Sequence, residues 1–145
     1  MKLVIQRVKS AKVEVDGKIV SKINRGLLVL LGVSETDSGS EIEWLAKKVV
    51  ELRIFEDNDK KMNLSLKDVG GEILLVSQFT LYADCRRGRR PDFNKAAKPG
   101  TAKKLYKEFS FELEKNGIKP KMGIFGAFMQ VFLCNDGPVT IILEK

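Results

Sequence analysis

The sequence predicts a single α/β domain that spans residues 1–145, and three observations support this prediction. Apolar segments with strand character alternate with two segments of helical periodicity, one near residues 40–52 and one near residues 101–116. An Asp-Gly pair at 16–17 lies between two strand-like segments and is typical of a tight hairpin, which indicates antiparallel neighbours. The length of 145 residues suits one domain with a sizeable core, and no repeat or linker divides the chain.

The composition is that of an ordered globular protein, with 43% hydrophobic and 31% charged residues. No apolar run approaches the ~20 residues that span a bilayer, and the apolar part of the N-terminus is shorter than that of a signal peptide. Cys85 and Cys134 lie far apart without a paired spacing, which favours neither a disulfide nor a zinc site. We therefore expect a cytoplasmic protein with no metal, no cofactor and no membrane partner.

Histidine is absent from the chain, and this narrows the possible chemistry more than any other compositional fact. Ser-His-Asp and Cys-His catalysis, acid–base catalysis by imidazole, and histidine-ligated metals are all excluded. An enzyme built on this sequence must rely on carboxylates, hydroxyls, amides, backbone groups or a group of its own substrate.

The first part of the chain is predicted to form a sheet. Residues 3–8 and 11–15 have strand character, the second with clean alternation, and the Asp-Gly hairpin leads to a third strand at residues 18–23. The run Leu27-Leu28-Val29-Leu30-Leu31 is continuously apolar, which is typical of a strand covered on both faces.

Two helices are predicted from their caps and their apolar spacing. Ser40 and Glu43 have the spacing of a capping box, so the first helix is expected to begin after Ser40 and to end near Leu52. The second helix is expected at residues 101–116, with Gly117 as its C-terminal cap. Apolar residues at helical spacing predict the buried stripes, namely Ile42, Leu45, Ala46 and Val49 in the first helix and Ala102, Leu105, Phe109 and Leu113 in the second.

A strand predicted at residues 72–76 leads into the string Ser77-Gln78-Phe79-Thr80-Leu81-Tyr82. Hydroxyl and amide groups are therefore concentrated where an apolar run ends. Ser77 and Thr80 are candidate nucleophiles, although the chain has no histidine to activate either, and Gln78 is a candidate hydrogen-bonding group. An ordinary polar strand end, with Thr and Tyr placed by β-propensity, explains the same residues.

One segment carries the positive charge of the chain. Residues 84–107 contain nine lysines and arginines against two aspartates, an excess equal to the whole net charge of +7. Such a concentration indicates a polyanionic partner, and a solvated face kept charged for solubility is the competing interpretation. The basic residues of the segment are Arg86, Arg87, Arg89, Arg90, Lys95, Lys98, Lys103, Lys104 and Lys107.

The string Asn135-Asp136-Gly137-Pro138-Val139-Thr140 interrupts two apolar runs, residues 127–134 and 139–143. Proline fixes φ and lacks a donor, so a central strand cannot pass through the string. Two interpretations remain open: a hairpin turn between two strands, and a rigid Gly-Pro element whose carbonyl groups recognise something small. Upstream, Gly123 and Gly126 bracket an aromatic residue, which suits a bulge, a close approach by a ligand, or ordinary strand packing.

Together, the strings Ser77-Gln78-Phe79-Thr80-Leu81 and Asn135-Asp136-Gly137-Pro138-Val139-Thr140 resemble the signature pair of the D-aminoacyl-tRNA deacylases. The resemblance covers essentially the whole chain, including Asp16-Gly17, the apolar run after Gly26 and Phe125-Gly126-Ala127. The only unusual feature is how rich in arginine the loop at 86–90 is. The resemblance implies a homodimer of α/β domains, each with a largely antiparallel, bent, barrel-like sheet and two main helices packed on one side.

The resemblance also implies an activity and a set of site residues. The activity is hydrolysis of the ester that joins a D-amino acid, or glycine, to the terminal adenosine of tRNA, while L-aminoacyl-tRNA is spared. Gly137-Pro138 would be cis and would enter the partner subunit's pocket, where its carbonyl groups exclude an L side chain. The implied catalytic residues are Ser77, Gln78, Phe79 and Thr80, the implied substrate-binding residues are Phe125, Gly126, Ala127, Met129, Asn135 and Thr140, and the implied tRNA-phosphate contacts are Arg86, Arg87, Arg89, Arg90 and Lys103.

No residue offers Thr80 a base, so we expect water to attack the ester with help from the ribose hydroxyl of the substrate. Backbone amides near Gln78 and Phe79 are expected to form the oxyanion site, and Thr80, which the family has suggested as a nucleophile, is expected to orient the substrate. Two other classes of function remain. One is a non-catalytic RNA-binding module, and the other is an esterase or thioesterase that uses Cys85 or Cys134.

Overall fold

The computed structural model describes residues 1–145 and contains one curved sheet, one small hairpin and two α-helices. The elements in chain order are β1 (Lys2–Val15), β2 (Lys18–Ile23), β3 (Gly26–Gly32), α1 (Ile42–Glu51), β4 (Phe55–Glu56), β5 (Met62–Leu64), β6 (Glu72–Ser77), the 3₁₀-helix η1 (Phe79–Tyr82), α2 (Pro99–Lys115), β7 (Lys121–Met122) and β8 (Gln130–Glu144). No helix combines the length and the apolar character needed to cross a bilayer.

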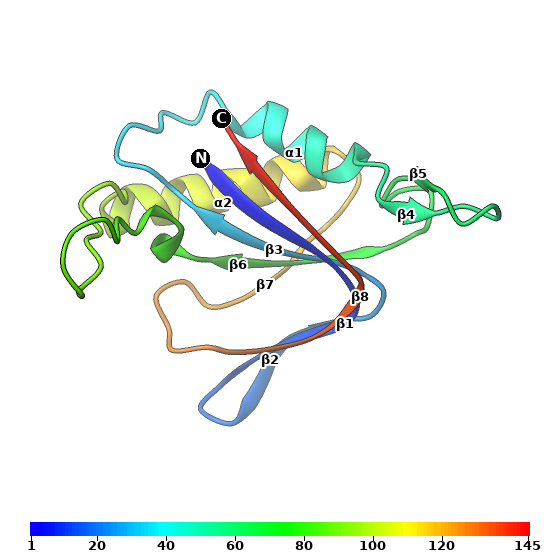
Figure 1. Cartoon of the computed structure of the whole chain (residues 1–145), viewed down its shortest axis with the longest axis horizontal. Coiled ribbons are helices and arrows are strands. Elements are labelled where there is room, and N and C mark those ends of the chain that lie inside the picture. The colour runs from blue at the N-terminus through cyan, green and yellow to red at the C-terminus, as the bar shows by residue number, and fades with distance from the viewer.

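The sheet confirms the predicted fold class. Its strands follow the order β2-β1-β3-β6-β7, and β8 pairs with the remaining edge of β1. The pairs that involve β1 are antiparallel, whereas β3–β6 and β6–β7 are parallel, so the sheet is mixed. β2 also contacts β6 and β7, because the sheet bends back on itself as Figure 1 shows.

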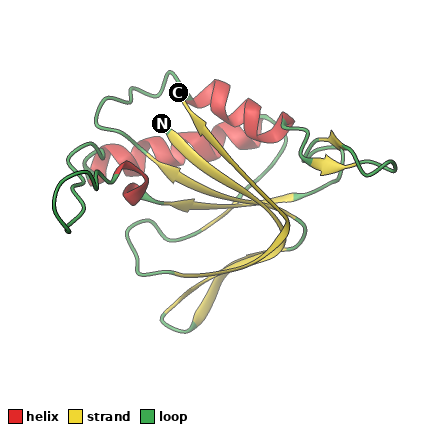
Figure 2. Ribbon diagram, in the orientation of Figure 1, coloured by secondary structure: helices red, strands yellow, loops and turns green.

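Both helices lie on the same side of the sheet, as expected (Figure 2). The main core forms between this face and the helices, and all eight apolar residues predicted for the helix stripes are buried in it. A smaller core, which includes Val8, Val13 and Leu28, fills the concave part of the sheet. The helices therefore cover one face, and the strands that lead to the candidate site, β3 and β6, are largely buried.

β3 confirms the prediction of a strand covered on both faces. Leu27, Val29 and Leu31 pack into the core beneath the helices, while Leu28 packs into the smaller core on the other face. In register, β3 runs parallel to β6, with Leu31 opposite Ser77. The two most buried strands therefore end together, next to the first of the predicted site residues.

Two predicted boundaries are wrong. The capping box does not form: α1 has Glu41 at its N-cap position without a side-chain cap, and the carboxylate of Glu41 accepts a hydrogen bond from the Gly39 N–H instead. The strands expected at residues 3–8 and 11–15 are one continuous strand, β1, with irregular register between Gln6 and Ser10. The continuity of β1 comes from its pairing with β8 on both sides of the irregular stretch.

The Gly-Pro string does not form a hairpin turn, because β8 continues through it beside β1. Val8 pairs with Asn135 and Gln6 pairs with Thr140, so the four residues 136–139 bulge opposite the single residue Arg7. β8 is an edge strand, and a proline at a bulge in an edge strand removes no ladder hydrogen bond. The expectation that a central strand cannot pass through the string is not contradicted, because β8 lies at the edge of the sheet.

Candidate active site

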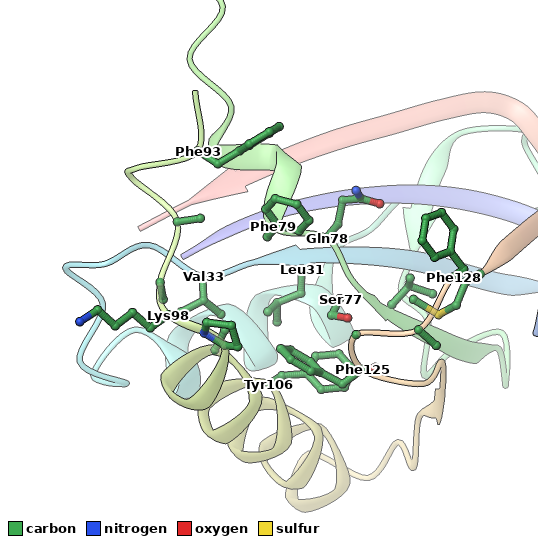
Figure 3. A pocket seen from close by; sticks show the side chains of 18 of the residues that line it. Leu31, Val33, Ser77, Gln78, Phe79, Phe93, Lys98, Tyr106, Phe125 and Phe128 are labelled. Carbon is green, nitrogen blue, oxygen red and sulfur yellow. The ribbon is translucent and has the colours of Figure 1, made fainter. Parts of the chain in front are cut away.

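A cavity of about 700 Å³ opens where β6 ends, between η1, the start of α2 and the loop that precedes β8 (Figure 3). Its walls are mostly apolar, and the polar side chains of Ser77 and Gln78 are among its few polar groups. The residues that line it are Leu31, Val33, Val76, Ser77, Gln78, Phe79, Phe93, Ala96, Ala97, Lys98, Pro99, Ala102, Tyr106, Phe125, Gly126, Ala127, Phe128, Met129 and Val131. A mostly apolar cavity with a few convergent polar groups is typical of a small-molecule site.

The predicted string at 77–80 lies at the edge of this cavity. Ser77 is the last residue of β6, and the N–H of Gln78 donates to the Leu31 carbonyl oxygen at 2.7 Å, which ends the pairing with β3. The chain then turns into η1, so Phe79 and Thr80 leave the line of the strand. Ser77, Gln78 and Phe79 line the cavity, whereas Thr80 does not.

Thr80 is held by a neighbouring amide. Its Oγ1 accepts a hydrogen bond from Nε2 of Gln78, and its side chain is exposed. An amide nitrogen that donates to a hydroxyl cannot take a proton from it, so this contact orients Thr80 and does not activate it. That Thr80 orients the substrate stays a prediction.

The backbone N–H groups at this turn differ in availability. That of Gln78 is already paired with Leu31, so it is not available to an oxyanion, contrary to the expectation for this residue. Phe79 and Thr80 are the first residues of η1, where N–H groups have no partner within the helix. The backbone donors that remain for an oxyanion are therefore those of Phe79 and Thr80.

The opposite wall comes from the loop before β8, where the structure gathers four residues predicted from the resemblance: Phe125, Gly126, Ala127 and Met129. Phe128, which sequence reasoning missed, also lines the cavity and is 95% exposed. Figure 3 shows Phe128 on one side of the opening and Phe79 with Phe93 on the other. The position of Phe128 in an otherwise apolar string did not mark it as a site residue, because core aromatics have the same pattern.

Tyr106 is a second residue that sequence reasoning missed, since it falls within the buried stripe of α2. Its hydroxyl donates to the Leu75 carbonyl oxygen at 2.8 Å, and its ring contacts Phe125 with centroids 5.8 Å apart. The same carbonyl accepts a hydrogen bond from the Gly123 N–H at 3.0 Å. Burial raises the pKa of Tyr106, so the hydroxyl stays protonated and keeps donating at ordinary pH. Tyr106 thereby joins α2, β6 and the wall loop.

The predicted residues of β8 are not part of this cavity. Asn135, Gly137, Pro138 and Thr140 do not line it, and all four are exposed. The Gly137-Pro138 peptide bond is cis, and Gly137 has φ of +127°. The structure therefore places the two signature strings at separate positions on one subunit.

Arg7 supports the Gly137-Pro138 bulge from inside. Its side chain is 5% exposed, Nε donates to the Asp136 carbonyl oxygen at 3.0 Å, and Nη1 donates to the Ile54 carbonyl oxygen at 2.6 Å. Carboxylates of Asp136 and Glu56 lie 3.5 Å and 3.7 Å from the guanidinium. A buried arginine with several acceptors fixes the backbone around it, and nothing in the sequence pattern marked this residue.

The predicted phosphate contacts lie outside the cavity, mostly on the loop between η1 and α2. Arg86 is paired with Asp84, which lowers the pKa of that carboxyl group below its usual range. Arg87, Arg89 and Arg90 are exposed and make no ion pair. Lys103 is exposed on α2. Lys98, which was counted in the basic segment but not among the site residues, does line the cavity.

Comparison with known proteins identifies the family. The family model described as D-Tyr-tRNA(Tyr) deacylase matches residues 4–144. The chain is 62% identical to the D-aminoacyl-tRNA deacylase of Desulfatibacillum aliphaticivorans over 145 residues, which covers 100% of this chain and 99% of the relative. It is 58% identical to that of Thermosipho africanus (strain TCF52B), with 100% and 97% covered.

Two solved structures share the fold. One, a c-Myc DNA unwinding element binding protein, superposes with a TM-score of 0.94 at 45% identity and covers 100% of this chain and 99% of its own. The other, a probable eukaryotic D-amino acid tRNA deacylase, has a TM-score of 0.80 at 20% identity, with 98% and 97% covered. The extent and identity of the sequence matches show that the chain belongs to the D-Tyr-tRNA(Tyr) deacylase family.

Proposed function

We propose that this chain hydrolyses the ester bond of D-aminoacyl-tRNA and of tRNA mischarged with glycine, and that it spares L-aminoacyl-tRNA. The family and the names of its relatives support the deacylase activity. The observation that carries the proposal is the cavity at the end of β6, where Ser77, Gln78 and the first N–H groups of η1 meet an apolar pocket. A nucleoside with a small acyl group fits such a site by size and polarity.

The proposed chemistry uses no side-chain base. The chain contains no histidine, and the only polar partner of the Thr80 hydroxyl is the Gln78 amide. Water attacks the ester carbonyl carbon, and the N–H groups of Phe79 and Thr80 stabilise the negative charge on the carbonyl oxygen, a contribution that is typically worth about 3–4 kcal/mol per donor. The bond between the acyl carbon and the ribose oxygen then breaks. The neighbouring ribose hydroxyl relays the proton of the water to that oxygen, which leaves free amino acid and tRNA.

A test of this chemistry is the comparison of Thr80→Ala with Thr80→Ser in single-turnover deacylation of D-Tyr-tRNA. Because the backbone supplies the oxyanion site, we expect both variants to retain turnover within about tenfold of the wild type. Loss of turnover in Thr80→Ala with full activity in Thr80→Ser would assign chemistry to the hydroxyl.

We further propose that two subunits associate through β8 and that Gly137-Pro138 of each subunit enters the partner's cavity. The outer edge of β8 pairs with no strand of its own chain, and Phe132, Leu133 and Ile142 on this strand are exposed. A long, apolar edge strand invites pairing with another chain. Gly137 and Pro138 are exposed and have no place in their own cavity, which fits a role in the cavity of a second copy.

In that arrangement, stereoselectivity comes from shape. Backbone carbonyls next to the substrate amino group leave room for hydrogen or a D side chain and collide with an L side chain. Such steric rejection separates mirror images more strongly than the ~1–3 kcal/mol that a missing hydrophobic contact provides. Glycine, which has no side chain, is accepted for the same reason.

The loop at residues 86–90, called the arginine loop below, supplies the contacts to tRNA in this proposal. Arg87, Arg89 and Arg90 have no carboxylate partner, so their charge is available to phosphates. Phosphate contacts position a nucleic acid without reading its sequence. Reversal of the three charges to glutamate should weaken binding and flatten its dependence on salt. An unchanged salt dependence would assign the loop to solubility.

The decisive experiment compares the release of amino acid from D-Tyr-tRNA, L-Tyr-tRNA and Gly-tRNA by the purified protein. We expect rapid release from D-Tyr-tRNA and Gly-tRNA, and no release above the spontaneous rate from L-Tyr-tRNA. Equal rates on the D and L esters would refute the stereochemical part. Cys85→Ser and Cys134→Ser should each leave the rates unchanged, because neither sulfur lines the cavity, and loss of turnover in either variant would support an esterase that uses that cysteine.

Nucleic-acid binding without catalysis is the second candidate function. It is favoured by the unpaired arginines and by the name of the relative that binds a DNA unwinding element. Binding of uncharged tRNA together with failure to release D-tyrosine in the same assay would support this candidate instead.

A further inference from the structure

Two aromatic rings connect the arginine loop with the cavity. Phe79 of η1 and Phe93 of the following loop meet edge to face, with ring centroids 5.0 Å apart and an interplanar angle of 65°. Both rings line the cavity, and both are partly exposed, Phe79 to 56% and Phe93 to 36%. Figure 3 shows Phe93 directly beside Phe79 at the opening. Edge-to-face geometry is one of the favoured arrangements of an aromatic pair.

Phe93 follows the closed base of the arginine loop. The backbones of Asp84 and Asp92 exchange two hydrogen bonds, at 2.8 Å and 2.9 Å, so residues 85–91 project from this base as one unit. The carboxylate of Asp92 accepts hydrogen bonds from the backbone N–H and the side-chain amide of Asn94, at 2.7 Å and 2.9 Å. Asp92, the residue before Phe93, therefore belongs both to the base of the loop and to the turn at Asn94.

The far side of Phe93 is anchored to the sheet side of the cavity. Ala97 N–H donates to the Val33 carbonyl oxygen at 2.9 Å, and Glu35 N–H donates to the Lys95 carbonyl oxygen at 3.0 Å. Phe93 thus lies between an anchored segment and a projecting loop, which is the position of a hinge.

The arginines at the base and at the tip of the loop differ in whether they form an ion pair. Arg86, next to the base, is held by Asp84, while Arg87, Arg89 and Arg90 at the tip have no ion pair. A phosphate that binds the tip has no internal ion pair to break there. The binding energy is then available to hold the loop in one position.

We propose that Phe93 is a positioning residue that couples phosphate binding at Arg87, Arg89 and Arg90 to the placement of Phe79 in the cavity. The phosphates are those of the ribose-phosphate backbone near the 3′ end of the substrate, so this inference rests on the proposed function. With the tip occupied, Phe93 holds the Phe79 ring and the first turn of η1 in the position that reacts. The coupling predicts that the loop contributes to turnover as well as to binding.

A double-mutant cycle tests the coupling with D-Tyr-tRNA as the substrate. One arm replaces the tip arginines (Arg87→Gln, Arg89→Gln, Arg90→Gln), one arm is Phe93→Ala, and the third combines them, with kcat and KM measured separately. Phe93→Tyr keeps the edge-to-face contact, and Phe93→Leu keeps the apolar bulk without the ring. Phe111→Ala removes a ring that is 63% exposed on α2, outside the cavity, and serves as the matched control.

We expect Phe93→Ala to lower kcat by about threefold to tenfold, the range of an aromatic pair contact. Phe93→Tyr should restore kcat, whereas Phe93→Leu should not, and Phe111→Ala should match the wild type. Neutralising the tip should lower kcat and raise KM in the wild-type background but raise KM alone in Phe93→Ala. A thermal melt of each variant establishes that it is folded.

The coupling is refuted if the effects on kcat multiply in the combined variant, if Phe93→Leu is as active as Phe93→Tyr, or if Phe93→Ala changes KM only. Each of these outcomes leaves the proposed function intact, since the wild-type protein still releases D-tyrosine. Failure of the wild-type protein to release it would instead refute the proposed function itself.

Discussion

Replacement of Arg7 by methionine should destabilise the protein by about 3 kcal/mol. The guanidinium is buried and donates to two carbonyl oxygens that belong to different segments, Ile54 and Asp136. Hydrogen bonds from a charged donor contribute about 1.5–3 kcal/mol each, so the pair has an upper limit near 6 kcal/mol. The carboxylates of Asp136 and Glu56 are 28% and 51% exposed, so each ion pair adds at most about 1 kcal/mol.

The lost hydrogen bonds account for nearly the whole cost, because methionine retains most of the apolar stem of arginine and the packing loss is small. The Asp136 carbonyl lies in the bulge of an edge strand, where water can replace part of the lost bond. A net loss of about 3 kcal/mol follows. The stability of Arg7→Lys should lie between those of the wild type and Arg7→Met, because one ammonium group cannot reach both carbonyls in the planar geometry of a guanidinium.

The assay is urea unfolding followed by circular dichroism at a fixed protein concentration, because association would add to the apparent stability. With a slope of about 2 kcal/mol per molar urea, the midpoint should fall by about 1.5 M. Arg87→Met is the matched control, since Arg87 is exposed and unpaired, and its midpoint should change by less than about 0.25 M. A shift of Arg7→Met no larger than that of the control, at unchanged slope, would refute the reasoning.

Three further perturbations test other contacts. Tyr106→Phe should cost about 1 kcal/mol in the same unfolding assay, because the Leu75 carbonyl keeps its bond from the Gly123 N–H; a loss above about 3 kcal/mol would contradict this. Gly137→Ala should destabilise by about 1–3 kcal/mol and reduce deacylation, since φ is +127° and the added Cβ would lie 3.1 Å from Nη2 of Arg7. Its control is a glycine of α2 without close neighbours, Gly100→Ala, whose stability should stay the same or rise. The pKa of Glu72 is lowered, first by its hydrogen bond with Lys121, so its stabilising effect exists above the unfolded pKa of about 4.3 and is lost as pH falls through the folded value. The midpoint difference between wild type and Glu72→Gln should therefore be present at pH 7 and vanish towards pH 3, and a constant difference would exclude this ion pair as its cause.

Local pattern was sufficient for most of the elements. The continuous apolar run at 27–31 predicted a strand covered on both faces, and it contributes to both cores. Gly117 predicted the end of α2, where its N–H and that of Ile118 donate back to the last turn. These features depend on residues a few positions apart, which the sequence contains directly. The polar string at 77–80 was visible in the sequence, but its pattern also fitted an ordinary strand end, and only the family resemblance implied a site there.

The tertiary structure alone decided the features that depend on distant residues. Whether β8 passes through Gly137-Pro138 depends on its position at the sheet edge beside β1, more than a hundred residues earlier in the chain. Arg7 became a structural residue because the Ile54 and Asp136 carbonyls meet there, and Phe93 became a cavity residue because it meets Phe79. Periodicity determines which face of an element is apolar, but which groups meet across the fold is set by packing among elements that the sequence does not list as neighbours.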